Sequence, residues 1–178
     1  MMDQFKEDIV TCRSTLLPNV LYALCWVLIV VSGLYAFMLL QVLFMVSFDV
    51  VTAVTLLLSI ACAVLLFLVK DNLKTEYEYT FTNGTLDFAK VLRGARRKEL
   101  GSMNVANVAA SGHVAHESFK RYLSMKDVQR KNWFLNRDGN LFYFYYTKEG
   151  RKHMIIIEPS EELVQMMIPY FQAGVYQG

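Results

Sequence analysis

Cysteine is scarce in this sequence, and it is missing from the entire C-terminal part. The three cysteines are Cys12, Cys25 and Cys62. A small domain held together by disulfides needs paired cysteines, so that class is excluded, and the pattern is typical of a reducing compartment. The formal net charge is only +2, which is too small to favour a nucleic-acid partner.

Charge is almost absent between Pro18 and Val69, where Asp49 is the only charged residue. Crossing about 30 Å of hydrocarbon takes about 20 apolar residues at about 1.5 Å each. We therefore expect residues 18–69 to form a transmembrane helical hairpin, with spans at about 20–46 and 50–69 and a turn at Ser47-Phe48-Asp49. The lipid bilayer is then the first partner of the chain.

Basic residues indicate the orientation of this hairpin. Lys6 and Arg13 precede the first run, Lys70 and Lys74 follow the second, and the turn contains no Lys or Arg. Cytoplasmic flanks carry the excess of Lys and Arg in membrane proteins. We expect an integral membrane protein with both termini cytoplasmic. The first run is also too long for the core of a cleaved signal peptide.

Small residues share one face of each expected span, and two interpretations of them remain open. Ser32 and Gly33 lie in the first span, and Thr55 and Ser59 lie in the second. Small residues allow helices to approach closely in lipid. The stripe predicts either a seam for a dimer or channel, or packing of the hairpin on itself.

Residues 1–17 form a short amphipathic segment. Phe5, Ile9, Cys12 and Leu16 recur at helical spacing, with Asp3 as an N-cap. We expect a short helix, which either lies in the membrane interface or packs against the domain that follows the spans.

After Lys70 the pattern changes to strand-like alternation. Residues 76–82 alternate polar and aromatic or β-branched side chains, and Asn83-Gly84 follows. This dipeptide favours a type I′ turn, because both central residues need positive φ. The turn predicts a hairpin that pairs Phe81 with Leu86 and Tyr79 with Phe88 on one face.

Further strands are expected along the rest of the chain. A turn at Arg93–Lys98 leads into a strand from Lys98 to Val108, and residues 109–126 are read as loop followed by a short helix from Glu117 to Met125. A three-stranded meander follows, at residues 132–137, 140–147 and 151–158. Its two-residue turns would set Trp133 opposite Phe144, Phe144 opposite Ile155, and Leu135, Phe142 and Ile157 in line.

A helix is expected to close the chain after Glu158-Pro159-Ser160. Glu161 and Glu162 would occupy its first turn, where the helix dipole favours acids. Pro169 should kink or shorten it. Its apolar face would pack on the sheet.

This order of elements resembles a membrane-anchored, bacterial pleckstrin-homology-like (PH-like) barrel, in which spans precede strands and one C-terminal helix. Three runs carry a closer similarity to a family of small two-span membrane proteins of Gram-positive bacteria with a domain of unknown function. They are Glu76–Asp87, Arg96-Arg97-Lys98 and Ile157–Glu161. The resemblance covers residues 70–172 and implies architecture and a location in the bacterial plasma membrane, but no catalytic residues.

Histidines offer the main candidate for metal chemistry. His113, His116 and Glu117 stand close in sequence, and His153 would approach only through the fold. Zinc needs three or four ligands and a second shell, so we expect no metal here. The alternative is a membrane-bound metalloenzyme that uses His113 and His116.

Ser, His and Asp occur without an ordered catalytic signature, and no glycine-rich phosphate loop is present. We therefore expect no catalytic residues and no cofactor.

The basic cluster at Arg93, Arg96, Arg97 and Lys98 is the main candidate for lipid contact. Each Lys or Arg beside an anionic leaflet contributes about 1 kcal/mol. The alternative is a solvated turn.

The run Tyr143–Tyr146 predicts either a binding surface or a strand covered on both faces.

We conclude that the sequence encodes an α+β protein: a short N-terminal segment (1–17), a transmembrane hairpin (18–69) and a cytoplasmic PH-like barrel with a C-terminal amphipathic helix (70–178). The expected function is that of a membrane-anchored, non-enzymatic binding or scaffolding module, with an anionic-lipid sensor as the alternative. The partner expected is a protein or a second copy of the chain. The sequence does not specify a small molecule.

Overall fold

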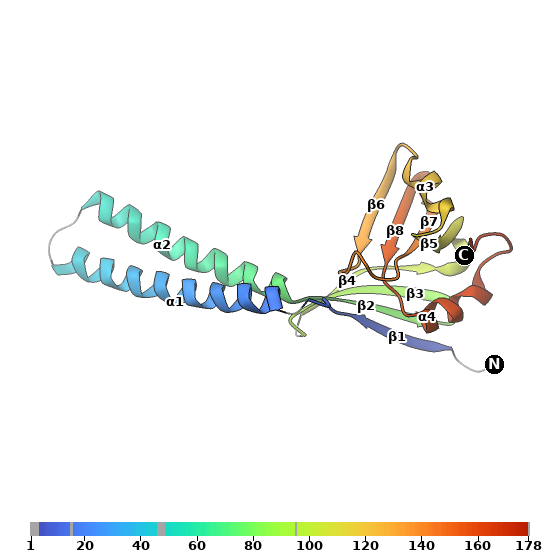
Figure 1. Ribbon diagram of the computed structural model, residues 1–178. Coiled ribbons are helices and arrows are strands. Elements are labelled where there is room, and N and C mark those ends of the chain that lie inside the picture. Colours follow the sequence, from blue (N-terminus) through green and yellow to red (C-terminus); the bar gives the residue numbers. More distant parts are fainter. Residues whose placement is uncertain (1–3, 15, 46–48, 95, 178) are drawn as a thin grey trace. The chain divides into compact units, whose positions relative to one another are not determined.

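The computed structural model describes residues 4–14, 16–45, 49–94 and 96–177. The chain forms two compact units. One consists of residues 14–75 and contains the two long helices; the other combines the residues before and after them and contains both sheets (Figure 1). The predicted cap at Asp3 and the turn residues Ser47 and Phe48 lie outside the described residues.

Two long apolar helices make up the first unit. Helix α1 spans Leu16–Met45 and helix α2 spans Val50–Val69. Pro18 lies in the first turn of α1, where its missing N–H costs no hydrogen bond. Asp49 caps α2 by accepting a hydrogen bond from the N–H of Thr52 at 3.0 Å. Both helices are long and apolar enough to cross a membrane.

The exposure of these helices distinguishes them from the core helices of a water-soluble domain. No described residue of α1 is buried, and Ser59 is the only buried residue of α2. Apolar surface of this extent is covered in folded proteins, by protein or by lipid. The two helices are therefore candidate transmembrane helices, as the sequence predicts.

The small-residue stripe packs the hairpin on itself. The Ser32 hydroxyl donates to the Ser59 carbonyl oxygen at 2.8 Å, and the Ser59 hydroxyl donates to the Ser32 carbonyl oxygen at 2.9 Å. These reciprocal bonds satisfy both hydroxyls inside an apolar surface. The interpretation as self-packing is confirmed.

The basic residue at the end of α2 is buried by aromatic rings. Lys70 is 2% exposed. Its ammonium lies 4.2 Å from the centroid of the Phe67 ring and 2.9 Å from the Asp71 carboxylate. A cation over a ring face together with an ion pair offsets the cost of desolvation. The short 3₁₀ helix η1 (Lys70–Lys74) continues from this point to the first residue of a strand.

The first sheet has the strand order β1-β2-β3-β4. Its strands are β1 (Phe5–Val10), β2 (Thr75–Thr82), β3 (Thr85–Leu92) and β4 (Arg96–Asn104). Asn83 and Gly84 have φ values of 46° and 90°, as the predicted type I′ turn requires. The rings of Tyr79 and Phe88 meet edge to face, 6.2 Å apart. The β2–β3 hairpin is therefore confirmed.

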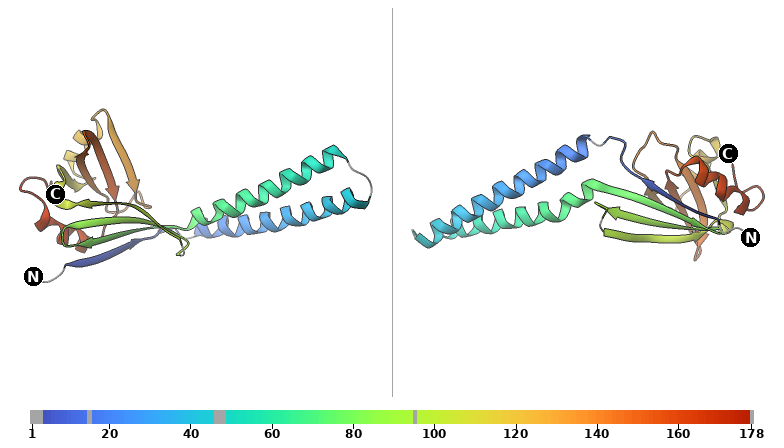
Figure 2. Two further views of the ribbon diagram at one scale, coloured as in Figure 1. Left: turned by 180° about the vertical axis from the view of Figure 1, so that it is seen from behind. Right: turned by 90° about the horizontal axis from the view of Figure 1, so that it is seen from below.

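The N-terminal helix prediction is wrong, because residues 5–10 form strand β1. This strand pairs antiparallel with β2, from Phe5 opposite Thr82 to Val10 opposite Tyr77 (Figures 1 and 2). The helical spacing misled because the apolar Phe5 and Ile9 are exposed, at 60% and 58%. The inward face carries two charged residues instead, since Lys6 pairs with Glu162 and Asp8 accepts bonds from Ser160, while Val10 packs on the core. The alternative, packing against the domain, is confirmed.

The second sheet has the strand order β5-β7-β8-β6. Its strands are β5 (Ala110–His113), β6 (Val128–Trp133), β7 (Phe142–Lys148) and β8 (Arg151–Ile157). The β7–β8 hairpin has the predicted register, with Phe144 opposite Ile155 and Phe142 opposite Ile157. The expected loop at residues 110–113 is wrong, because that segment pairs with β7 as strand β5.

The expected antiparallel pairing of Trp133 with Phe144 is also wrong. Strand β6 runs parallel to β8, and Trp133 lies opposite Ile157. The other edge of β7 is occupied by β5, with Ser111 opposite Phe144. Residues 134–141 therefore leave the sheet and cross over before β7 begins, and the expected Leu135 position in the ladder does not form.

Four short helices complete the second unit: α3 (Glu117–Leu123), α4 (Glu161–Met167), η2 (Val105–Asn107) and η3 (Ile168–Tyr170). The predicted helix near 117–125 is present as α3. The strand predicted at 98–108 is β4, and it ends earlier, where η2 begins. Ser160 caps α4 by accepting from the N–H of Leu163 at 3.2 Å. Pro169 shortens this helix as expected, since η3 replaces its next turn.

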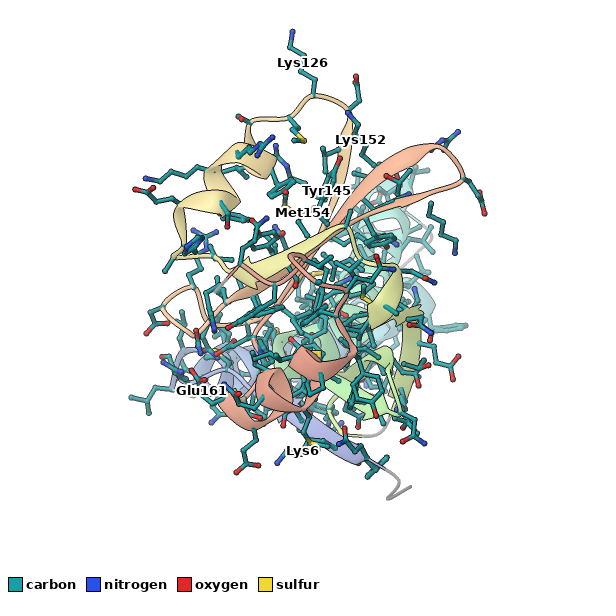
Figure 3. The ribbon with its side chains drawn as sticks, turned by 90° about the vertical axis from the view of Figure 1, so that its right-hand side faces the viewer. Lys6, Lys126, Tyr145, Lys152, Met154 and Glu161 are labelled. Carbon is teal, nitrogen blue, oxygen red and sulfur yellow. The ribbon has the colours of Figure 1, made fainter. Side chains whose placement is uncertain are left out.

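The main core lies between the two sheets and α4. Its largest buried side chains come from all three layers: Tyr79, Phe81, Leu86, Phe142, Phe144, Ile157, Leu163 and Met167. A second cluster forms under α3, where Phe119 meets Tyr143, Tyr145 and Met154 (Figure 3). Strand β7 is thus covered on both faces over Tyr143–Tyr145, which are buried, whereas Tyr146 is half-buried. The α+β class is confirmed, and the two sheets are not closed into a barrel.

A buried carboxylate joins three segments at one corner of this unit. Glu158 is 8% exposed and accepts from the backbone N–H of Asn136 at 3.1 Å and from its amide at 2.9 Å. The Asn136 amide also donates to the Thr11 carbonyl oxygen at 3.0 Å, and its oxygen accepts from the Arg13 N–H at 2.8 Å. The end of β8, the 134–141 crossover and the N-terminal segment are therefore bonded to one another.

We predict that removal of β1 destabilises the sheets. One fragment joins residues 4–13 to residues 74–177 through a short Gly/Ser turn, and the other contains residues 74–177 alone. The second fragment loses the β1 ladder and the bonds to Asn136 and Ser160. At about 1 kcal/mol for each hydrogen bond, its free energy of unfolding should be lower by about 3 kcal/mol or more. Urea unfolding measures the difference, and equal midpoints would contradict it.

We also predict that Glu158→Gln lowers the free energy of unfolding by about 2–3 kcal/mol, because an amide NH₂ would then face the donors of Asn136. Glu99→Gln is the matched control, since Glu99 is exposed on β4. Thermal unfolding of both variants measures the effect. A Glu158 variant as stable as the control would show that the corner contributes little.

Candidate functional site

A cleft opens between the two sheets on the side where they are not closed. Its volume is about 300 Å³. Edge strand β4 contributes Gly101 and Ser102 to one wall, and the second sheet contributes most of the rest. We call it the seam cleft and define it by the residues that line it: Phe88, Gly101, Ser102, Gln129, Lys131, Trp133, Tyr146, Lys148, Glu149, Arg151, His153 and Ile155.

Alternation along the strands explains which residues line the seam cleft. On β8, Ile157 and Ile155 face the main core, and His153 and Arg151 continue the same face. On β6, Trp133 is followed on that face by Lys131, and Lys131 lies opposite Ile155 in the parallel pair. Successive residues of a strand point to opposite faces. One sheet face therefore changes from apolar core to basic cleft along the strands.

The rim of the seam cleft carries excess positive charge. Lys131, Lys148 and Arg151 are basic, and Glu149 is the one carboxylate among the lining residues. Lys148 and Arg151 lie opposite each other at the end of the β7–β8 hairpin. Within the part of the chain that the structure describes, none of the three basic groups has a carboxylate within 4.0 Å. Among the described residues, therefore, no ion pair balances these charges.

The floor of the seam cleft is apolar and closely packed. Trp133 is 9% exposed, and Phe88 and Ile155 are each 2% exposed. The rings of Phe88 and Trp133 are 4.8 Å apart, and the ammonium of Lys131 lies 5.3 Å from the centroid of Trp133. A flat apolar group that enters the cleft would meet the edge of this aromatic pair.

Two polar groups stand beside the floor. The rings of Tyr146 and His153 stack at 5.3 Å. Burial raises the pKa of the Tyr146 hydroxyl above its usual value, so the hydroxyl stays a neutral hydrogen-bond donor at physiological pH. The Nδ1 atom of His153 is buried and has no hydrogen-bond partner among the described residues. A buried polar atom without a partner is costly unless a ligand or water satisfies it.

A β-bulge shapes the β4 wall. The register of β3 and β4 shifts between Phe88 and Ala89, opposite Gly101 and Glu99. Gly101 has a φ of 145°, a conformation that L-residues rarely adopt. Nothing lies within 4 Å of the place that a Cβ would take, so backbone conformation rather than space requires the glycine here.

The predicted lipid-contact residues do not form one uniform patch. Arg93 lies in the β3–β4 turn with a φ of 54°, and Arg96, Arg97 and Lys98 are the first residues of β4. Alternation directs Arg97 to the face opposite Arg96 and Lys98. The guanidinium of Arg97 pairs with the Glu78 carboxylate at 2.8 Å. Lipid contact through these residues stays a prediction.

The histidines have local structural contacts. His113 donates from Nδ1 to the Asn140 amide oxygen at 2.9 Å. His116 caps α3, and its Nδ1 lies 2.8 Å from the Ser118 hydroxyl. His153 lies instead in the seam cleft. No group of three His, Cys, Asp or Glu residues suited to a metal ion occurs among the described residues.

Sequence reasoning missed the seam cleft because it placed β6 wrongly. Gln129 and Lys131 precede the strand that was expected to begin at Asn132. A signal was present in the hairpin that was predicted correctly. Lys148 and Arg151 flank the Glu149-Gly150 turn, on the same sheet face as Phe144 and Ile155. The sheet face that covers the core is therefore basic at the turn end of the hairpin.

A comparison with protein families identifies one match to the chain. The family described as "Bacterial PH-like domain (DUF6106)" matches residues 2–177. No curated protein and no solved structure matches significantly. The match begins before β1 and continues beyond η3, so it includes the two long helices as well as both sheets.

Proposed function

The chain belongs to the bacterial PH-like domain family (DUF6106), and from this membership we propose that it is a membrane-anchored, non-enzymatic binding module. The two apolar helices anchor it, and the PH-like domain holds a protein partner at the open edge of β4. The observation that carries this proposal is the exposure of that edge. In the described chain β4 pairs only with β3, and most of its nine residues are exposed.

Charge divides this edge into two halves. The first half, Arg96–Glu99, is charged, and charges on an edge strand discourage unplanned pairing. The second half, Leu100–Asn104, has no charge. Its outer N–H and C=O groups are available to an added strand, which is a common mode of peptide recognition. We therefore place the partner along Leu100–Asn104.

A second copy of the chain is one partner that fits this edge. Antiparallel pairing of two β4 strands about Leu100 would set Lys98 opposite Ser102 and Arg96 opposite Asn104. Like charges directly opposite each other destabilise a strand pair, and this register avoids them. The uncharged half of each copy would receive the charged half of the other.

The β1–β2 pairing and the basic residues beside the helices support a membrane topology. Strand β1 precedes the first helix and pairs with β2, which follows the second. Pairing requires both flanks of the hairpin to lie on one side of the membrane. The basic residues Lys6, Arg13, Lys70 and Lys74 assign that side to the cytoplasm. We propose a plasma-membrane protein with both termini inside the cell.

The partner prediction is tested by photo-crosslinking in native membranes. A benzophenone amino acid at Ser102 should give one discrete adduct on irradiation, because Ser102 lies in the uncharged half of β4. The same amino acid at Lys120, exposed on α3, should give none. An adduct of twice the chain mass identifies a second copy, and another mass identifies a different protein. Identical adducts from both positions, or none from Ser102, would contradict the proposed edge.

The topology prediction is tested by reporter fusions. A reporter that is active only in the cytoplasm should be active when joined after Gly178 and inactive when inserted at Phe48. A phosphatase that is active only outside the cell should give the reverse pattern. An externally active C-terminal fusion would overturn the assignment.

A further inference from the structure

We propose that the seam cleft binds an oxyanion carried on a flat apolar body, such as an aryl phosphate. The site adjoins the β4 edge, because Gly101 and Ser102 form one wall of the cleft, but the groups that would contact the ligand are side chains of the second sheet. The residues that would contact the anion are Lys131, Lys148 and Arg151, and the apolar body would lie on Trp133.

The first argument is charge. Three basic groups share the rim with one carboxylate, Glu149, and none of the three is paired within the described residues. Lys148 and Arg151 lie opposite each other across the hairpin end, where like charges repel, and an anion bound between them relieves that repulsion. The guanidinium of Arg151 can also form two parallel hydrogen bonds to a phosphate or a carboxylate. The rim therefore favours an anion over a neutral or cationic ligand.

The second argument is the floor. A site for a free inorganic anion has no need of aromatic walls, yet Trp133 and Phe88 pack 4.8 Å apart beneath the basic rim. Trp133 keeps 9% of its surface exposed, and an apolar group placed against that part gains from covering it. The ligand therefore carries an apolar part in addition to its charge.

The third argument is the unpartnered atom of His153. Its Nδ1 is buried beside the floor and forms no hydrogen bond with the described residues. The stacked ring of Tyr146, 5.3 Å away, holds the imidazole in place. The nitrogen is not exposed at the cleft surface, so a polar group on the ligand would satisfy it only after the imidazole turns toward the cleft.

Size and rigidity agree with a small ligand. The cleft volume of about 300 Å³ lies at the lower end of the range for small-molecule sites, about 300–1,000 Å³. Its lining residues lie mostly on paired strands, which hold side chains more firmly than loops do. The Glu149-Gly150 turn, with φ values of 52° and 73°, keeps Lys148 and Arg151 opposite each other.

The experiment uses the full-length protein with a single tryptophan as reporter. The chain has two tryptophans, so Trp26→Phe leaves Trp133 alone. The variant is placed in nanodiscs of zwitterionic lipid and titrated with benzyl phosphate, inorganic phosphate or benzyl alcohol. We expect saturable change in Trp133 emission with benzyl phosphate, at a concentration about tenfold lower than either half of that molecule requires. A rise in melting temperature with benzyl phosphate is the second readout.

Charge-removing variants test the residues. Lys131→Gln combined with Arg151→Gln should weaken benzyl phosphate binding about tenfold or more. Lys126→Gln combined with Lys152→Gln is the control, because it removes equal charge outside the lining of the cleft (Figure 3). The control should bind within about twofold of the parent, a difference of less than about 0.5 kcal/mol.

Two sources of the oxyanion are distinguished by the lipid. If a membrane headgroup fills the cleft, nanodiscs with anionic lipid should shift Trp133 emission before any titration and should compete with benzyl phosphate. If the ligand is soluble, anionic lipid should leave the titration unchanged. The proposal is overturned if neither source changes Trp133 emission or melting temperature. It is also overturned if the cleft variant and its control lose binding equally.

Discussion

The buried carboxylate of Glu158 is the contact on which the arrangement of the second unit depends. A charge out of water is costly unless hydrogen bonds compensate it, and Asn136 supplies them from both its backbone and its side chain. Asn136 lies in the 134–141 crossover, so these bonds hold the crossover at the end of β8, between the parallel strand β6 and the start of β7. The same asparagine bonds Thr11 and Arg13, so the N-terminal segment is held at this corner too.

Local signals predicted the parts of the fold that depend on neighbouring residues. The Asn83-Gly84 and Glu149-Gly150 turns set the register of two hairpins, because positive φ at both turn positions leaves little choice of pairing. The apolar runs likewise predicted both long helices. Strands β1 and β6 could not be predicted in this way. Their partners are distant in sequence, and two of the three inward side chains of β1, Lys6 and Asp8, are charged.

The candidate site shared this limit. The basic rim at Lys148 and Arg151 lies on a hairpin that the sequence predicts correctly, but the cleft has a second wall from β6 and a third from the β4 bulge. Lys131 is placed beside Ile155 only by the parallel register. Gly101 shapes the β4 wall of the cleft through its backbone conformation, and no local sequence pattern predicts that conformation. A site formed by three strands that are distant in sequence can be identified only when the strand pairing is known.

The position of the two helices in the chain has a mechanical consequence. They interrupt the connection between β1 and β2, where a tight turn would otherwise join two antiparallel neighbours. Both strands leave the pair at the same end, at Val10 and Tyr77. Tension that separates the helices would load the backbone bonds of this pair one after another, as in unzipping, and not all together, as in shear. The β1–β2 ladder would therefore yield to movement of the two helices from its Val10 end, and the bonds of Asn136 to Thr11 and Arg13, which lie nearest the helices, would be lost before those of Ser160 and Glu162 to β1.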